Sequence, residues 1–406
     1  MSGSPPKKIA KTEELAPIFS KPMSSKGTWT ELGKELLFFT PDGIENREKI
    51  AGFDMDGTLI KTKSGNVFPK NPEDWQLWDH SVSKKIRQAH QDGFKICIFT
   101  NQKGLETKKV NPADLKKKIQ KICGAIGVPI QAFVSPGSSK FRKPSIGMWE
   151  FLENEGNGGV KVNRGDSVYV GDAAGRIKTP ERPKADHSSA DRLFALNLGV
   201  RFQTPEQFFL DQKSDEPYKM PPFDPKFLLE NSKPQFEPEL ELNNQITQIL
   251  LLVGSPASGK SHLSKWLQDE YGFTIVNQDT LGTKEKCLKK CKELIEEGEK
   301  VVVDNTNRDK ATRKNYIDLA RRLSVPIRCV KMNIDYPQAA HLNTFRTVIG
   351  AGKVHKGVNS FVLKQYFNAY QEPKEEEGFE KVVTCNFVPK FEKKEHEEIF
   401  FRYLNE

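Results

Sequence analysis

The run IAGFDMDGT at residues 50–58 decides the fold of the first half of this chain. Its opening residues are apolar or small, as in a buried parallel strand, and two carboxylates, Asp54 and Asp56, follow at once. Side chains two positions apart point the same way on an extended chain. Because ligands of open α/β sheets bind beyond the carboxyl ends of the strands, this pair is placed to bind a divalent cation and a phosphate group.

Short apolar stretches alternate with helical patterns around this run, which predicts βα units and a parallel sheet. The first series continues with FKICIF (94–99), IQAFV (130–134), SVYV (167–170) and LFALNLG (193–199). A second series consists of QILLLVG (248–254), FTIVNQD (273–279), VVVDNTN (301–307) and IRCVKMN (327–333). We therefore predict an α/β protein with two doubly wound parallel-sheet domains.

Composition divides the 406 residues into four segments. Residues 1–28 are rich in Ser, Pro and Lys, and we predict that they form a flexible basic tail. Residues 29–210 are the predicted first domain. The proline-rich residues 211–245 are the predicted linker to the second domain, residues 246–406.

The charge and the cysteines limit the class of protein. A formal net charge of +9 favours polyanionic partners, because lysines and arginines that bind phosphates release condensed counterions. No apolar stretch approaches the roughly 20 residues of a membrane span, so we expect an intracellular protein that does not bind membranes. The six cysteines show no CxxC spacing and are expected to be reduced structural thiols.

The carboxylate pair of the first domain suits phosphate-ester hydrolysis in two steps. We predict that Asp54 is the nucleophile and forms an aspartyl-phosphate. Asp56 is the predicted acid that protonates the leaving alkoxide and then the base that activates water. Both are predicted magnesium ligands, together with Asp172, which follows the apolar run SVYV in the motif GDAAGR.

Positive charge and hydrogen-bond donors must surround the phosphate, because a dianion repels the attacking carboxylate. Thr100 and Asn101 follow the strand predicted at 94–99 and Lys143 lies in FRKP, and we predict that all three bind the phosphate. Asp191, in SSADRLFALNLG, has two open interpretations. It either lies near the metal, or it caps a helix or pairs with Arg192.

The motif DMDGT, the strand-terminal Thr100, Lys143 and GDAAGR (171–176) resemble, in this order, the four motifs of the haloacid-dehalogenase phosphatase superfamily. The resemblance implies a haloacid-dehalogenase-like fold for the first domain. It also implies magnesium-dependent dephosphorylation through an aspartyl-phosphate.

The run GSPASGKS at residues 254–261 lies between a predicted strand and a predicted helix, which is the setting of a P-loop. Backbone N–H groups of such a loop bind the phosphates of ATP, while Lys260 reaches the β and γ phosphates and Ser261 binds magnesium. The predicted ATP-binding residues are Gly254, Ser255, Ala257, Ser258, Gly259, Lys260, Ser261 and Arg346.

Polar residues at the ends of the next strands are candidates for the acceptor side of a kinase. Asp279, in IVNQDTLG, is the predicted base that takes the proton of the attacking hydroxyl. Asp304 ends the run VVV and is predicted to contact magnesium through water or to orient the acceptor. Arg313 and Arg346 are predicted to clamp the transferring phosphate.

The second half resembles polynucleotide 5′-kinase domains in GSPASGKS, NQDT, DNTN and the late Arg346. From about residue 30 onward the chain resembles the eukaryotic bifunctional polynucleotide kinase 3′-phosphatases, in which the phosphatase comes first. This resemblance implies an enzyme that removes 3′-phosphates and phosphorylates 5′-hydroxyls with Mg²⁺ and ATP. DNA strand-break termini are the implied substrate, with RNA ends as an alternative, and the protein is expected to be monomeric and nuclear, with mitochondria as a second compartment.

Two departures from that family stand out. Gln278 precedes the predicted base where members often have arginine, so one positive charge fewer lies near the acceptor. Only a short tail precedes Trp29, whereas vertebrate members carry a forkhead-associated domain there. Repair scaffold and ligase proteins remain candidate partners, but not through that module.

Two other functions fit parts of the sequence. The first is a fused phosphatase and kinase that acts on a small phosphorylated metabolite, for which binding would depend only weakly on salt. The second is a scaffold protein with inactive sites, which the joint presence of Asp54, Asp56, Lys143, Asp172, Lys260, Ser261 and Asp279 disfavours.

Overall fold

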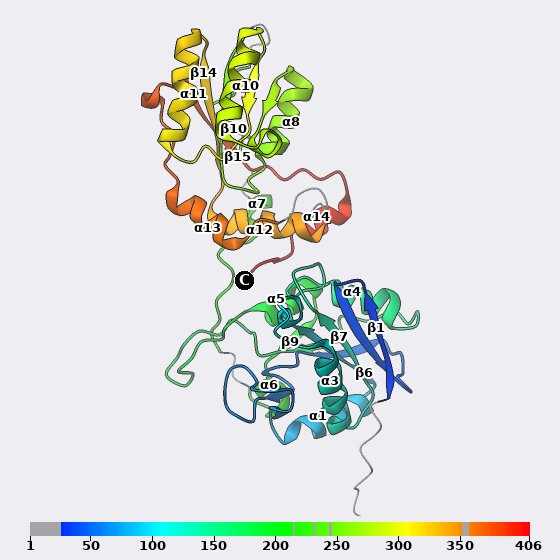
Figure 1. The fold of residues 1–406 in the computed structure, drawn as a ribbon. Helices are drawn as coiled ribbons and strands as arrows, with labels where there is room; N and C mark the ends of the chain where they lie inside the picture. Colours follow the sequence, from blue (N-terminus) through cyan, green and yellow to red (C-terminus); the bar gives the residue numbers. More distant parts are fainter. Residues whose placement is uncertain (1–25, 214–215, 231–232, 243–245, 351–356) are drawn as a thin grey trace, which may run out of the picture.

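The structure is a computed structural model that describes residues 26–213, 216–230, 233–242, 246–350 and 357–406. The described part of the chain forms two domains, each built on its own mostly parallel sheet with helices packed on it (Figure 1). The predicted α/β class is confirmed. The predicted tail lies outside the described residues as far as residue 25, and the first strand already begins at Gly27.

The first domain contains a seven-stranded sheet in the order β1-β2-β7-β6-β3-β8-β9. The five strands from β7 to β9 in that order are parallel, and an antiparallel hairpin of β1 and β2 extends the sheet beyond β7. The strands are β1 (Gly27–Leu32), β2 (Leu36–Pro41), β3 (Lys49–Phe53), β6 (Phe94–Asn101), β7 (Ile130–Ser135), β8 (Val168–Val170) and β9 (Arg201–Gln203). A separate small sheet pairs β4 (Ile60–Lys61) with β5 (Gln76–Leu77).

Both faces of this sheet are buried, because alternate residues of its central strands enter two different hydrophobic clusters. On β6, Ile96 and Ile98 belong to the cluster that includes α1 and α3, whereas Cys97 and Phe99 belong to the cluster around Trp149. This explains why the strand is apolar at nearly every position. The helices are α1 (Ser81–Gln91), α2 (Lys103–Glu106), α3 (Pro112–Ile126), α4 (Gly147–Phe151), α5 (Ala190–Leu198) and α6 (Pro205–Phe209).

The second domain contains a six-stranded sheet in the order β10-β15-β14-β11-β13-β12, parallel except for β10. Its strands are β10 (Phe236–Glu237), β11 (Ile249–Val253), β12 (Thr274–Val276), β13 (Val301–Val303), β14 (Ile327–Asn333) and β15 (Val382–Asn386). Its helices are α8 (Lys260–Tyr271), α9 (Gln278–Leu281), α10 (Lys284–Glu296), α11 (Lys310–Leu323), α12 (Tyr336–Val348), α13 (Ser360–Ala369) and α14 (Lys394–Phe400).

The predicted linker is in part folded into both domains, which corrects the boundaries at 210 and 245. At its start, the Lys219 N–H donates to the carbonyl of Gly175 at 2.9 Å, so the chain pairs with the loop that follows β8. Near its end, β10 pairs with β15 and extends the second sheet. Backbone hydrogen bonds are non-local here, and proline content alone does not reveal them.

The C-terminal residues connect the two domains, and the chain end lies between them in Figure 1. The side-chain amide of Asn197, on α5, bonds the backbone N–H and carbonyl of Tyr403, both at 2.8 Å. Arg402 forms an ion pair with Glu150 at 3.0 Å. Since Asn197 also donates to the carbonyl of Pro144, the chain end is tied to the loop that carries Lys143.

The six cysteines are free and buried, as predicted. No helix within the described residues is both long and apolar enough to cross a membrane.

Candidate active sites

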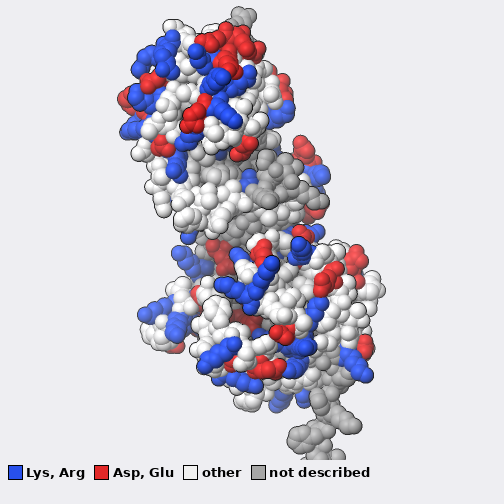
Figure 2. All heavy atoms as spheres, in the orientation of Figure 1, with Lys and Arg blue, Asp and Glu red and all other residues white. Residues whose placement is uncertain are grey.

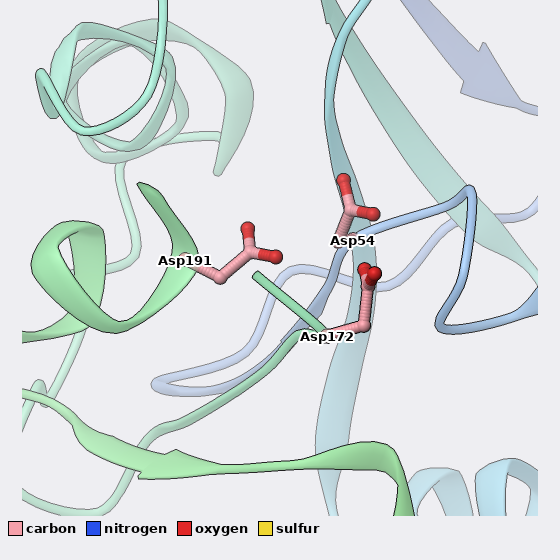
Figure 3. A group of neighbouring side chains, drawn as sticks. All are labelled: Asp54, Asp172 and Asp191. Carbon is pink, nitrogen blue, oxygen red and sulfur yellow. The ribbon is translucent and has the colours of Figure 1, made fainter. Parts of the chain in front are cut away.

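The first site brings together three carboxylates from separate elements of the first domain. Asp54 follows β3, Asp172 follows β8 and Asp191 lies in the first turn of α5. One oxygen atom from each lies within 4.8 Å of the others, and Figure 3 shows the three side chains converging. The first interpretation of Asp191, that it lies near the metal, is the one that the geometry favours.

Lys143 provides the positive charge at the centre of this cluster. Its Nζ lies 2.7 Å from Asp54 Oδ1, 2.6 Å from Asp191 Oδ1 and 2.8 Å from the hydroxyl of Tyr169. Only 3% of the Lys143 side chain is exposed. Burial alone would lower the pKa of Lys143, but Asp191 and Asp54 raise it above its usual value, so the amine stays charged.

Three carboxylates against one ammonium leave a net negative charge in this buried cluster. Burial raises the pKa of Asp54 well above its usual value, although Lys143 opposes the shift. Burial and the neighbouring Asp191 raise the pKa of Asp172 to about 7. Hard oxygen donors with uncompensated charge are the donor set that Mg²⁺ prefers, so the residues present fit this ion.

Gly57 permits the close packing of the loop on this site. Its φ is +84°, and a Cβ atom there would lie 2.4 Å from Asp172 Oδ2. The loop is fixed further by Thr58, whose hydroxyl accepts from the Asp172 N–H at 3.0 Å. The glycine of DMDGT is therefore required both by the backbone conformation and by the space beside a metal-site carboxylate.

Asp56 lies outside the carboxylate cluster, which corrects its prediction as a side-chain metal ligand. Its Oδ2 accepts from Gln102 Nε2 at 2.8 Å and its Oδ1 from Lys118 Nζ at 3.1 Å. The side chain is 51% exposed. This position at the edge of the site suits an acid and base that meets the leaving oxygen and then water.

The two polar residues at the end of β6 have different contacts. Thr100 is buried, and its hydroxyl accepts from Gln102 Nε2 at 2.9 Å, next to Asp56. Asn101 bonds the backbone of Lys143 in both directions, with its Oδ1 accepting at 3.0 Å and its Nδ2 donating at 3.1 Å. Its side-chain amide is therefore engaged in holding the lysine loop, and phosphate binding by Asn101 stays a prediction.

In the second domain the P-loop connects β11 to α8, as predicted. Lys260 is buried, and its Nζ donates to the carbonyl of Ser255 at 2.8 Å. Burial lowers the pKa of Lys260 to about 8, although the nearby Asp304 and Asp279 act in the opposite direction. The hydroxyls of Ser255 and Ser258 are buried without a hydrogen-bond partner among the described residues. A nucleotide phosphate would satisfy these groups, so the loop fits ATP.

The predicted acceptor residues lie around this loop. Asp304 follows β13, and its Oδ2 accepts from the hydroxyl of Ser264 on α8 at 3.2 Å. Asp279 is exposed in the first turn of α9. Arg346, on α12, is close enough to Lys260 to affect its pKa, and its Nε lacks a partner among the described residues. A cavity of about 470 Å³ beside α9 is lined by residues that include Gln278, Asn305 and Arg308.

Arg313 is a structural residue, which corrects its prediction as a phosphate clamp. It is fully buried, and its Nε and Nη2 donate to the carboxylate of Glu377 at 2.8 and 2.7 Å. Its Nη1 donates to the carbonyls of Asn307 and Gln371. Among the described residues, these hydrogen bonds all go to residues outside the P-loop.

We expect Arg313→Ala to destabilise the second domain by about 3–5 kcal/mol, because it leaves the Glu377 carboxylate buried without its partner. Thermal unfolding of the purified chain measures the effect, with Lys314→Ala as an exposed control from the same helix turn. If Arg313→Ala unfolded at the same temperature as the wild type but had lost its kinase activity, the structural role would be contradicted.

Several site residues were not predicted from the sequence. Lys118 is one of four lysines on α3, and nothing in the run LKKKIQK distinguishes it from its neighbours. Tyr169 reads as an ordinary core residue of β8. Gln102 directly follows Thr100 and Asn101, and the polar run TNQ after an apolar strand was the available signal for it.

Comparison with known proteins matches each domain to a family. The model described as polynucleotide kinase 3 phosphatase matches residues 49–209, and the model described as AAA domain matches residues 249–373. A Schizosaccharomyces pombe bifunctional polynucleotide phosphatase/kinase is 37% identical over 345 residues, which cover 85% of this chain and 81% of that protein.

Two further relatives match a little under half of the chain. The Arabidopsis thaliana polynucleotide 3′-phosphatase ZDP is 35% identical over 196 residues, 45% of this chain and 27% of that protein. A Saccharomyces cerevisiae polynucleotide 3′-phosphatase is 28% identical over 233 residues, 43% of this chain and 95% of that protein.

Proposed function

Since the chain belongs to the family of bifunctional polynucleotide phosphatase/kinases, we propose that it converts the termini of broken DNA strands into a 3′-hydroxyl and a 5′-phosphate. The first domain removes 3′-phosphates and the second phosphorylates 5′-hydroxyls with ATP. The observation that carries the proposal is the presence of two separate phosphate-chemistry sites, each at the carboxyl edge of its own parallel sheet.

In the phosphatase site, Asp54 attacks the phosphorus atom while the bond to the 3′-oxygen breaks. Asp56 donates a proton to that oxygen, and the nucleic acid leaves with a 3′-hydroxyl. Water then attacks the aspartyl-phosphate, Asp56 takes its proton, and inorganic phosphate is released. Lys143 keeps Asp54 in place through a 2.7 Å bond and offsets the charge of the phosphate.

Asp54, Asp172 and Asp191 would hold a magnesium ion in this site. When bound, such an ion neutralises charge on the phosphate and makes phosphorus more electrophilic. In the kinase domain, Ser261 at the start of α8 would hold the magnesium of the nucleotide.

In the kinase site, the backbone of residues 254–261 and Lys260 bind the ATP phosphates. Asp279 takes the proton from the 5′-hydroxyl as that oxygen attacks the γ-phosphorus and ADP leaves. Arg346 is far from Lys260 in the sequence but near it in space. It stabilises the charge that develops on the transferred phosphoryl group.

The net charge of +9 supports a polyanionic substrate. On the face shown in Figure 2, lysines and arginines occur on both domains, interspersed with acidic residues. DNA strand-break termini in the nucleus are the proposed substrate and compartment, with RNA ends and mitochondria as the alternatives. Repair scaffold and ligase proteins are the proposed partners, and the chain is proposed to act as a monomer.

An oligonucleotide with a 5′-hydroxyl and a 3′-phosphate tests the proposal directly. Incubated with the protein, ATP and magnesium, the oligonucleotide is expected to lose its 3′-phosphate and to gain a 5′-phosphate. Chelation of magnesium is expected to stop both reactions. Apparent affinity should fall steeply with salt, because each phosphate contact releases counterions. Single-stranded, nicked and recessed forms establish the preferred end structure.

Activity on small phosphorylated metabolites with no turnover of oligonucleotides would favour the alternative of a fused metabolite phosphatase and kinase. Turnover in the presence of excess chelator would contradict the proposed metal sites.

A further inference from the structure

Lys118 is directed at the phosphatase site, unlike the other lysines of its helix. On α3, Lys116 and Lys121 form ion pairs with Glu31 and Glu73, which lie outside the site, and Lys117 is exposed. The side chain of Lys118 is only 10% exposed, and its Nζ lies 3.1 Å from Asp56 Oδ1. The aliphatic part of Lys118 is thus buried, and its ammonium group lies beside Asp56, the acid and base of the reaction.

Two features around Lys118 point to a role beyond neutralising Asp56. The carboxylate of Asp56 is half exposed and is already fixed through its other oxygen by Gln102. The segment that leads from Gln102 to α3 contains Lys103, Lys108 and Lys109, all exposed and without an ion pair to any carboxylate in the described residues. With Glu106 as the one acidic residue between them, this segment carries net positive charge next to Gln102, which bonds Asp56.

We propose that Lys118 binds the phosphodiester group that precedes the terminal 3′-phosphate in a polynucleotide, and at the same time holds Asp56 in position. When the leaving 3′-oxygen lies beside Asp56, the next anion of the strand is the phosphodiester on the 5′ side of the same nucleoside. An ammonium group has three N–H donors, so it can bond a carboxylate and a phosphate together. The inference rests on the proposed 3′-phosphatase activity and adds a recognition element that distinguishes polynucleotides from small phosphate esters.

The test compares Lys118→Gln with Lys117→Gln, a matched control from the same helix, and with Lys118→Arg, which keeps the charge. Each variant is assayed on a 3′-phosphorylated single-stranded oligonucleotide and on a nucleoside 3′-monophosphate, which lacks the phosphodiester. The 5′-kinase activity of the same preparations controls for the amount of active protein, because that site lies in the other domain, and hydrolysis of the monophosphate reports whether the first domain is folded.

We expect Lys118→Gln to raise KM for the oligonucleotide on the order of tenfold and to leave KM for the monophosphate unchanged. The salt dependence of oligonucleotide binding should fall by the equivalent of about one phosphate contact, a slope change of roughly 0.7 for a single strand. Because Asp56 loses one of its two partners, kcat should fall several-fold on both substrates. Lys118→Arg should restore much of the oligonucleotide KM, and Lys117→Gln should match the wild type.

Equal oligonucleotide KM values for Lys118→Gln and Lys117→Gln would overturn the inference, as would a KM increase of the same size on the monophosphate. A wild-type chain that hydrolyses the monophosphate but not the oligonucleotide would instead contradict the proposed function, so the two failures are distinguishable.

Discussion

Asp54→Asn is expected to abolish 3′-phosphate removal while 5′-phosphorylation proceeds at the wild-type rate. The loss should be on the order of 10⁴-fold or more, because an amide cannot form the aspartyl-phosphate, and the remaining residues give little rate without the nucleophile. The substitution keeps the volume of the side chain, so Lys143 and Asp191 retain their mutual 2.6 Å bond. Release of phosphate from a 3′-phosphorylated oligonucleotide measures the effect.

The kinase reaction on the same oligonucleotide is the control for Asp54→Asn. Thermal unfolding should change little, because ionised Asp54 is disfavoured by burial and its replacement removes one negative charge from a crowded site. Phosphatase activity within tenfold of the wild type would show that another group is the nucleophile. Loss of both activities would show that the sites are not independent.

Lys260→Ala has the second largest expected effect, and it lowers the other of the two activities. It should reduce 5′-phosphorylation on the order of 10³-fold, since the amine that reaches the β and γ phosphates is removed, and 3′-phosphate removal should continue. Transfer of labelled γ-phosphate from ATP to a 5′-hydroxyl oligonucleotide measures it. Lys265→Ala, an exposed position on the same helix, provides the matched control.

The nucleotide-free stability of Lys260→Ala provides an independent readout. Burial lowers the pKa of Lys260 to about 8, so its charged form is disfavoured in the folded chain, and its removal should not lower the unfolding temperature. Protection by ATP against thermal unfolding should, however, weaken. A variant with unchanged kinase activity would mean that the loop binds something other than the donor phosphates.

Contiguous motifs allowed most of the fold and much of both sites to be predicted. DMDGT and GSPASGKS each contain their functional residues within a short stretch. Each follows an apolar strand whose side chains are buried on both faces of the sheet. Local conformation decides what such a motif can do: Gly57 adopts a positive φ, and Lys260 begins a helix directly after the loop. These features depend on neighbours in the sequence.

Other assignments depended on partners that sequence spacing does not reveal. Arg313 carries the same charge as Arg346. The Arg313 guanidinium, however, is buried in the core and pairs with Glu377, 64 residues further along the chain. Asn101 is adjacent to Thr100, yet it bonds the backbone of Lys143, 42 residues away.

The sequence by itself determined the α/β class, the two catalytic motifs and the family to which they belong, because strand periodicity and loop chemistry are encoded over short stretches. Tertiary structure alone decided that Asp191 joins Asp54 and Asp172 while Asp56 faces Lys118, and that part of the predicted linker is a strand of the second sheet. Parallel topology brings the carboxyl ends of distant strands to one edge, and side-chain packing there selects which charged groups meet.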